Sequence, residues 1–200
     1  MPVVESEFRS PWWMPSGHLQ TQLPVLLRWQ FPLGDPVLIP TRDNDQLSAS
    51  FYSSSTESKR LIILSHGLEG SNRQHYILGM IDYCLKNTIA GIQSDVLAWN
   101  LRGCGSPNNK THKLYFSGCI NDLDDVVVWA EQKGYAEIVL MGYSLGGNIT
   151  LRWLGEQGTN AISRKIKAVC TASSTVDLAS SVKKLDRLGN FLYRLFLFLV

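Results

Sequence analysis

One stretch, residues 137–147, constrains the fold of this chain more than any other. It begins with a short apolar run over 138–141, which favours a buried strand because it starts with β-branched residues and is too short for a helix. The next five residues, 142–146, read Gly-Tyr-Ser-Leu-Gly. A helical pattern of apolar residues follows, with the members Leu145, Ile149, Trp153 and Leu154. The sequence therefore predicts a strand, a tight turn and a helix in immediate succession, with Ser144 in the turn.

This context is typical of a nucleophile elbow, in which a serine lies on a sharp strand-to-helix turn. Such a turn leaves no room for side chains two residues before and after the serine, and glycine stands at both places, Gly142 and Gly146. The Leu145 N–H would face a developing oxyanion, assisted by the positive end of the helix. We predict Ser144 as a nucleophile and the Leu145 N–H as an oxyanion donor. The alternative is a Gly/Ser-rich turn in an ordinary βα unit.

A second loop follows the apolar run over 61–64 and reads His66-Gly67-Leu68. A His-Gly turn after an early strand is where this architecture supplies its other oxyanion donor. By position, that donor is the backbone N–H of Leu68. For Gly67 and His66 we predict a supporting role in the loop, and we prefer this role of His66 to the alternative of a catalytic base.

Strand and helix patterns alternate along the remaining chain. Strands are predicted over 37–39, 47–52, 95–99 and 167–171, with the first two joined by a turn at 42–45 and followed by a surface loop at 53–56. Helices are predicted over 76–86 and 121–133. This alternation indicates an α/β fold with a mostly parallel sheet covered by helices on both faces.

The N-terminal region differs from this pattern. Residues 1–34 are rich in Pro and Trp and predict an irregular aromatic arm, with a structural rather than catalytic His18. A short helix there would carry Leu19, Leu23, Leu26 and Leu27. We assign 35–200 to the α/β domain, and a cap or lid segment is one interpretation of 175–200.

Composition excludes several classes of function. The net charge is +2 and the basic residues are dispersed, so no nucleic-acid partner is expected. The four cysteines form no C-x-x-C pair and have no His at ligand spacing, so we expect no disulfide framework or zinc site. We interpret Asp122, Asp124 and Asp125 as the charged first turn of a helix rather than a metal cluster.

The ends of the chain favour a cytoplasmic protein. The first residues lack the basic and apolar regions of a secretory signal. The most apolar segment, 191–200, contains Arg194 and is far shorter than the ~20 residues that span a bilayer. We therefore expect a cytoplasmic protein with free thiols and no transmembrane segment.

Several motifs together resemble the YheT-like family of α/β-hydrolases. The matching stretches, which span roughly residues 11–180, are Pro11-Trp-Trp, Gly17-His-Leu-Gln-Thr21, Ser65-His-Gly-Leu-Glu-Gly-Ser71 with Tyr76, Asn100-Leu-Arg-Gly-Cys104, Tyr115 with Gly118, Asp122-Leu-Asp124, Gly142-Tyr-Ser-Leu-Gly-Gly-Asn148 and Trp153-Leu-Gly155. The resemblance implies the α/β-hydrolase fold and cofactor-free hydrolysis of carboxylic esters by a serine nucleophile. The implied partner is a small-molecule or lipid-like acyl ester.

The chain departs from this family pattern in one important respect. In this fold the triad follows the order Ser, Asp or Glu, then His, but all four histidines here precede Ser144. The resemblance thus implies that the last strands, with the triad Asp and His, are missing. Without a base Ser144 is a poor nucleophile, so we expect this chain alone to be weak or inactive. The alternative is a non-catalytic α/β-hydrolase-like binding protein or a degraded gene product.

Overall fold

The computed structural model describes residues 4–17, 19, 20, 23, 31, 33–54, 57–191 and 195 of the 200-residue chain. The chain divides into two compact units, Met1–Pro32 and Leu33–Val200. In the first unit, the Met14 N–H donates to the Pro11 carbonyl, and the Gln20 side chain donates to the Met14 carbonyl. Leu19 and Leu23 are helical, whereas His18, Leu26 and Leu27 lie outside the described residues.

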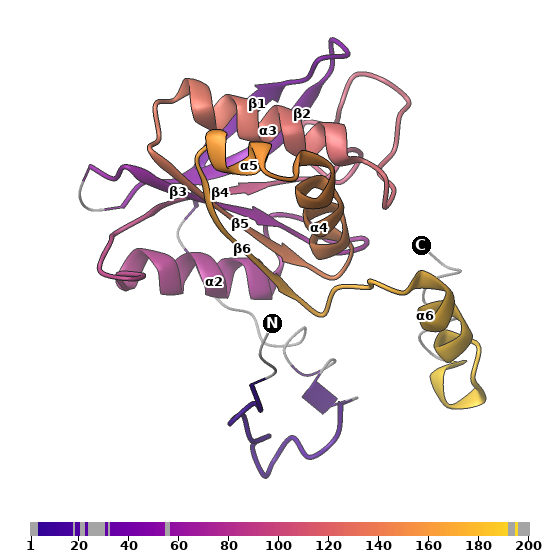
Figure 1. The fold of residues 1–200 in the computed structure, drawn as a ribbon. Helices are drawn as coiled ribbons and strands as arrows, with labels where there is room; N and C mark the ends of the chain where they lie inside the picture. The colour runs from indigo at the N-terminus through magenta and orange to yellow at the C-terminus, as the bar shows by residue number, and fades with distance from the viewer. Residues whose placement is uncertain are drawn as a thin grey trace. The chain divides into compact units, whose positions relative to one another are not determined.

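The second unit contains a six-stranded sheet in the order β1-β2-β4-β3-β5-β6 (Figure 1). The strands are β1 (Asp35–Pro40), β2 (Gln46–Tyr52), β3 (Arg60–Ser65), β4 (Asp95–Trp99), β5 (Glu137–Tyr143) and β6 (Ile166–Ala172). Strands β4, β3, β5 and β6 are parallel, whereas β1 and β2 form an antiparallel hairpin that continues the sheet beside β4. The predicted strands and the mostly parallel sheet are confirmed.

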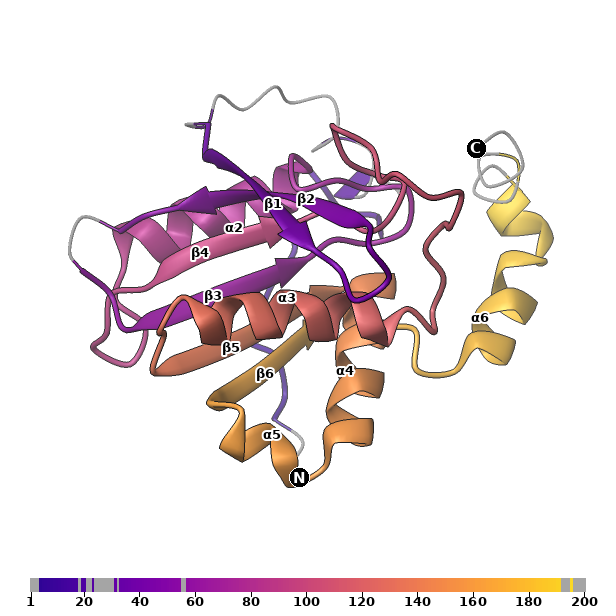
Figure 2. The same ribbon diagram turned by 90° about the horizontal axis from the view of Figure 1, so that it is seen from above.

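The longer helices cover both faces of the sheet. Helix α2 (His75–Lys86) lies on one face, and α3 (Ile120–Gln132) and α4 (Leu145–Gln157) lie on the other (Figure 2). The shorter elements that follow are α5 (Asn160–Ser163), α6 (Leu178–Leu185) and the 3₁₀ helix η1 (Leu188–Asn190). The predicted helices over 76–86 and 121–133 are confirmed to within a residue.

The central strands are buried on both faces because their side chains alternate between two apolar clusters. In β3, Leu61 and Ile63 join the cluster beneath α3 and α4, and Ile62 and Leu64 join the cluster beneath α2. Val96 of β4 likewise contacts the α2 side. This double burial explains why both strands read as continuous apolar runs.

The amino-terminal edge of the sheet has a polar anchor where the sequence predicts only a surface loop. Ser54 is buried, and its N–H and hydroxyl both donate to Asp95 Oδ1, at 2.8 and 2.9 Å. The Tyr135 hydroxyl donates to the other oxygen of Asp95 at 2.8 Å. The prediction of a purely exposed loop after β2 is therefore wrong at Ser54, because a buried carboxylate must be satisfied by donors from other segments.

Strand β6 forms one edge of the sheet. It pairs with β5, and no other described strand adds to its outer side. Lys167, Ala168 and Cys170 are exposed along it. In the part of the chain that the structure describes, no helix is both long and apolar enough to cross a membrane.

Candidate active site

Ser144 lies at the junction of β5 and α4 in a strained backbone conformation. Its φ is 50° and its ψ is −115°, in a region that side-chain-bearing residues rarely adopt. Its N–H donates to the Ala172 carbonyl of β6 at 2.9 Å, and its carbonyl accepts from the Asn148 N–H at 3.0 Å. These bonds hold the turn from both sides, and the serine is partly exposed.

The glycines flanking Ser144 are required by close backbone contacts. A Cβ at Gly142 would lie 2.6 Å from the Gly146 carbonyl oxygen, and one at Gly146 would lie 2.3 Å from the His66 carbonyl oxygen. Both distances are shorter than real Cβ atoms tolerate. The G-x-S-x-G spacing therefore has a steric cause here: the turn is packed against its own helix and against the end of β3.

The loop after β3 lies beside the serine. A Cβ at Gly67 would lie 3.1 Å from the Ser144 Cβ, so the two backbones approach closely. The Gly67 N–H donates to the Tyr76 hydroxyl at 3.0 Å, and the Tyr76 ring packs against Tyr143 at 4.9 Å between centroids. This support of the loop by Tyr76 could not be predicted, because nothing local in the sequence shows that a residue of α2 reaches it.

The backbone N–H groups of Leu68 and Leu145 are without acceptors among the described residues. Leu68 follows the Gly67 contact directly, and Leu145 is the first residue of α4. A free N–H pair beside a serine at a helix N-terminus is an arrangement that can stabilise negative charge on a bound oxygen.

His66 is fully buried, and both of its ring nitrogens are in use. Nε2 accepts from the Leu101 N–H at 3.0 Å, so Nδ1 carries the proton and donates to the Gly67 carbonyl at 2.8 Å. Burial lowers the pKa of the imidazole, partly offset by the Gly67 carbonyl and by Glu69. A neutral ring with no free nitrogen supports the loop and has no lone pair available for Ser144.

The lowered pKa of His66 predicts that stability decreases in mild acid. Below about pH 6.5 the unfolded chain binds a proton at this position that the folded chain does not, so the free energy of unfolding falls as the pH falls. The slope from this group cannot exceed about 1.4 kcal/mol per pH unit, the value for a difference of one bound proton. Urea unfolding between pH 7.5 and 5 measures the effect.

A two-dimensional NMR titration identifies the group directly, since the His66 ring should still be in the neutral Nδ1–H form at a pH where a histidine of ordinary pKa is half protonated. An imidazole at this position that protonates near pH 6.5 would contradict the prediction.

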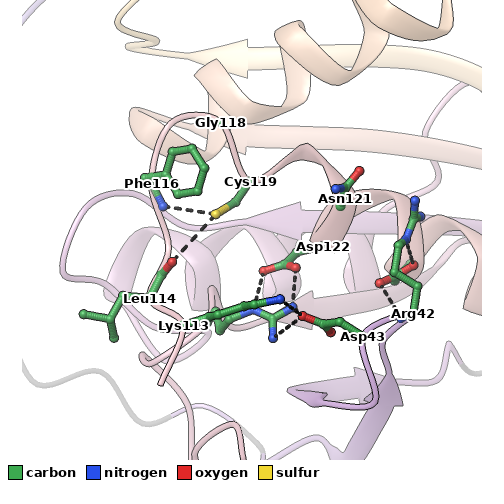
Figure 3. Close-up of a pocket in the computed structure, with 11 residues that line it drawn as sticks. Arg42, Asp43, Lys113, Leu114, Phe116, Gly118, Cys119, Asn121 and Asp122 are labelled. Carbon is green, nitrogen blue, oxygen red and sulfur yellow. Dashed lines mark hydrogen bonds and ion pairs between the residues drawn. The ribbon is translucent and has the colours of Figure 1, made fainter. Parts of the chain in front are cut away.

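A charged cavity of about 600 Å³ lies between the β1–β2 turn and the start of α3 (Figure 3). Arg102 is buried there and donates to Asp122 at 2.6 and 3.0 Å and to Asp45 at 2.7 Å. Lys113 pairs with Asp43 at 2.7 Å and, together with the Thr41 hydroxyl, lowers the pKa of Asp43 to about 2. Ser144, Leu68 and Leu145 do not line this cavity.

The carboxylates at the start of α3 include Asp122 in the first helical turn, as predicted, but they also form ion pairs that the sequence does not predict. Asp122 pairs with Arg102, Asp125 accepts from Arg42 at 2.8 Å, and Asp124 pairs with Arg42 and Arg164. Each carboxylate is thus neutralised by a guanidinium from a distant segment. Among the described residues, no group of three side chains is arranged to hold a metal ion.

Comparison with known families agrees with this architecture. The sequence profile of the α/β-hydrolase fold matches residues 60–196. The chain belongs to the α/β-hydrolase family. The resemblance to its YheT-like branch is confirmed by the putative esterase YheT of Escherichia coli, which is 31% identical over 147 residues, 72% of this chain and 42% of that protein.

A more distant relative and a solved structure of the same fold can be compared with this α/β-hydrolase. The monoacylglycerol lipase of Saccharomyces cerevisiae is 27% identical over 66% of this chain and 29% of its own length. The esterase Pf2001 of Pyrococcus furiosus superimposes with a TM-score of 0.62 at 24% identity, over 84% of this chain and 65% of that one. The chain thus spans less than half the length of YheT and of the yeast lipase.

Proposed function

We propose that this chain carries the nucleophile and oxyanion hole of a serine hydrolase that cleaves carboxylic esters. Ser144 Oγ would attack the ester carbonyl carbon, and the Leu68 and Leu145 N–H groups would bind the oxygen as it becomes negative. Collapse of this intermediate would release the alcohol and leave an acyl-serine, from which water would release the acid. The observation that carries the proposal is the strained Ser144 packed against Gly67, with unused N–H groups on the next residue of each segment, Leu145 and Leu68.

The proposed substrate class is a lipid-like acyl ester. Two relatives carry the names putative esterase and monoacylglycerol lipase, and the side chain of Leu68, whose backbone N–H is a proposed oxyanion donor, is half exposed. An exposed apolar side chain at that position would contact the chain of a bound acyl group. We place the activity in the cytoplasm because the four cysteines are free thiols.

The second candidate is a non-catalytic binding protein with the same fold. It is favoured by one observation: no described side chain forms a hydrogen bond with the Ser144 hydroxyl, and the His66 ring is fully used. A serine without a base keeps its proton and attacks slowly. Such a site could still bind an acyl ester or a carboxylate at the free N–H groups.

A fluorophosphonate probe separates the two candidates. The probe phosphonylates an activated serine with loss of fluoride, so intact-mass measurement and peptide mapping should show one adduct at Ser144 if the chain is a hydrolase. Absence of an adduct at saturating probe, in a folded sample, would favour the binding protein over the hydrolase.

A further inference from the structure

Tyr115 makes a two-point contact with the loop that carries the proposed oxyanion donor. The Glu69 N–H donates to the Tyr115 hydroxyl at 3.0 Å, and the same hydroxyl donates to Glu69 Oε1 at 2.5 Å. The two residues are 46 positions apart. One phenol therefore holds both the backbone and the side chain of Glu69.

Glu69 adopts a conformation that needs such support. Its φ is 51°, in the left-handed region that costs residues other than glycine of the order of 1–2 kcal/mol. It lies in a tight turn closed by the Gly70 N–H, which donates to the Gly67 carbonyl at 3.1 Å. A positive φ at the third of the four residues is the type II pattern, which favours Gly or Asn at that place. Leu68 therefore lies between Gly67, which approaches Ser144, and the strained Glu69.

Tyr115 is itself well anchored. Its ring packs against the main apolar cluster, whereas its neighbours Leu114 and Phe116 are exposed. Burial and the Glu69 carboxylate raise the pKa of its hydroxyl, so the phenol stays protonated and remains a donor. The segment is also held at the start of α3: the Phe116 N–H donates to the Sγ of Cys119, the residue before the helix, at 3.2 Å.

We propose that Tyr115 is a positioning residue for the oxyanion hole: it holds Glu69 in its left-handed conformation and thereby fixes the direction of the Leu68 N–H. Tyr115 acts through Glu69 and does not touch the substrate. The catalytic part of this proposal rests on the proposed function, whereas the structural part concerns the turn alone. Preorganisation of this kind affects the transition state, in which the oxyanion forms, more than substrate binding.

The test is Tyr115→Phe, which removes one hydroxyl and keeps the ring. Amide hydrogen exchange should show the Gly70 N–H, which closes the turn, exchanging about tenfold faster or more, since hydrogen bonds to a charged group are among the stronger ones. In ester cleavage, kcat should fall by roughly 10–100-fold, approaching the loss seen when one oxyanion donor is removed, with KM changing less than about twofold.

The matched control is Tyr135→Phe. Tyr135 also donates its hydroxyl to a carboxylate, Asp95, but at the opposite end of the parallel strands. Tyr135→Phe should leave kcat unchanged. It should speed Gly70 exchange by no more than the loss of global unfolding free energy accounts for. Gly70 exchange within twofold of wild type in Tyr115→Phe would overturn the proposal, as would faster exchange spread equally over the whole domain.

The two proposals can fail separately. If Ser144→Ala retains full ester cleavage, the hydrolase assignment is lost, but the exchange measurement still decides whether Tyr115 holds the turn. If Ser144→Ala is inactive and Tyr115→Phe retains wild-type kcat, the hydrolase assignment stands and the positioning role is wrong.

Discussion

Replacing Ser144 with alanine is expected to abolish phosphonylation and to reduce cleavage of a p-nitrophenyl acyl ester to the background rate. In a complete serine-hydrolase site, loss of the nucleophile costs about 10⁶-fold in turnover. The size of the measured loss reports how far Ser144 is activated. Alanine fills no more space than serine, and Ser144 makes no side-chain hydrogen bond that caps α4, so the fold should be preserved.

The control for Ser144→Ala is Ser174→Ala. The Ser174 hydroxyl is buried, has no hydrogen-bond partner among the described residues, and lies where a Cβ on Gly147 would meet it at 2.0 Å. It is thus a second serine beside α4 that the proposed mechanism does not use. Ser174→Ala should keep wild-type labelling. Labelling that survives in Ser144→Ala would remove the nucleophile assignment.

Arg102→Met is expected to destabilise the fold strongly. The guanidinium is 4% exposed and joins Asp122 to Asp45, whose side chain is fully buried. Methionine keeps an unbranched side chain of similar length but leaves both carboxylates without their cation. Breaking a buried ion pair in this way typically costs about 3–5 kcal/mol of unfolding free energy.

Urea unfolding at pH 7 measures this loss, with Arg152→Met as the control. Arg152 is more than half exposed and pairs with Glu156 one helical turn away, so its removal should change stability by no more than about 0.5 kcal/mol. A loss below about 1 kcal/mol for Arg102→Met at pH 7 would contradict the prediction, because it would lie far under the cost of breaking a buried ion pair.

The loss caused by Arg102→Met should also depend on pH. Burial by itself would raise the pKa of Asp45, but hydrogen bonds from Thr111 and Lys110 outweigh it, so this pKa is lowered in the folded protein. The stabilising contribution of Asp45 is therefore present above the pKa of an unfolded aspartate, about 4, and is lost as the pH falls below that value. The difference in unfolding free energy between wild type and Arg102→Met should narrow in the same range.

The sheet could be predicted from the sequence because its signals are local. Residues 61–64 and 138–141 are apolar runs of strand length, and each becomes a strand: the first is buried on both faces, and the second is buried on one face and partly buried on the other. Gly134, at φ 86°, ends α3 as its position after the periodic segment predicts. The strand order could not be predicted from local signals, because it depends on contacts between distant segments. One example is the pairing of the β1–β2 hairpin with β4.

The ion pairs between the α3 carboxylates and three arginines could not be predicted from the sequence for the same reason. Asp122, Asp124 and Asp125 read as the favourable first turn of a helix, and only the folded chain brings Arg42, Arg102 and Arg164 to them. Charge spacing along one helix indicates neighbours on that helix, not partners that lie 20 to 83 residues away. A buried arginine in a loop has no sequence signature of its own.

In the candidate site, too, some features could be predicted from the local sequence and others depend on contacts between distant segments. The tight turn at Ser144 and the His-Gly loop beside it could be predicted, because a tight turn and a close backbone approach each demand glycine, which the sequence displays. The supports of these loops were not predicted, because Tyr76 and Tyr115 come from other elements and look like ordinary core aromatics. The residues that shape the proposed oxyanion hole are therefore partly visible in the sequence and partly a product of the fold.

Among the described residues, no strand pairs with the outer side of β6, and this has a consequence for the behaviour of the chain in solution. A strand edge with open N–H and C=O groups can accept a strand from a second molecule. Here the two lysines at its beginning, Lys165 and Lys167, are exposed and would repel the same residues of an approaching copy. Salt screens such repulsion over about 10 Å at 0.1 M ionic strength. Self-association through this edge should therefore increase as ionic strength rises, so dilute buffers of low salt favour the monomer.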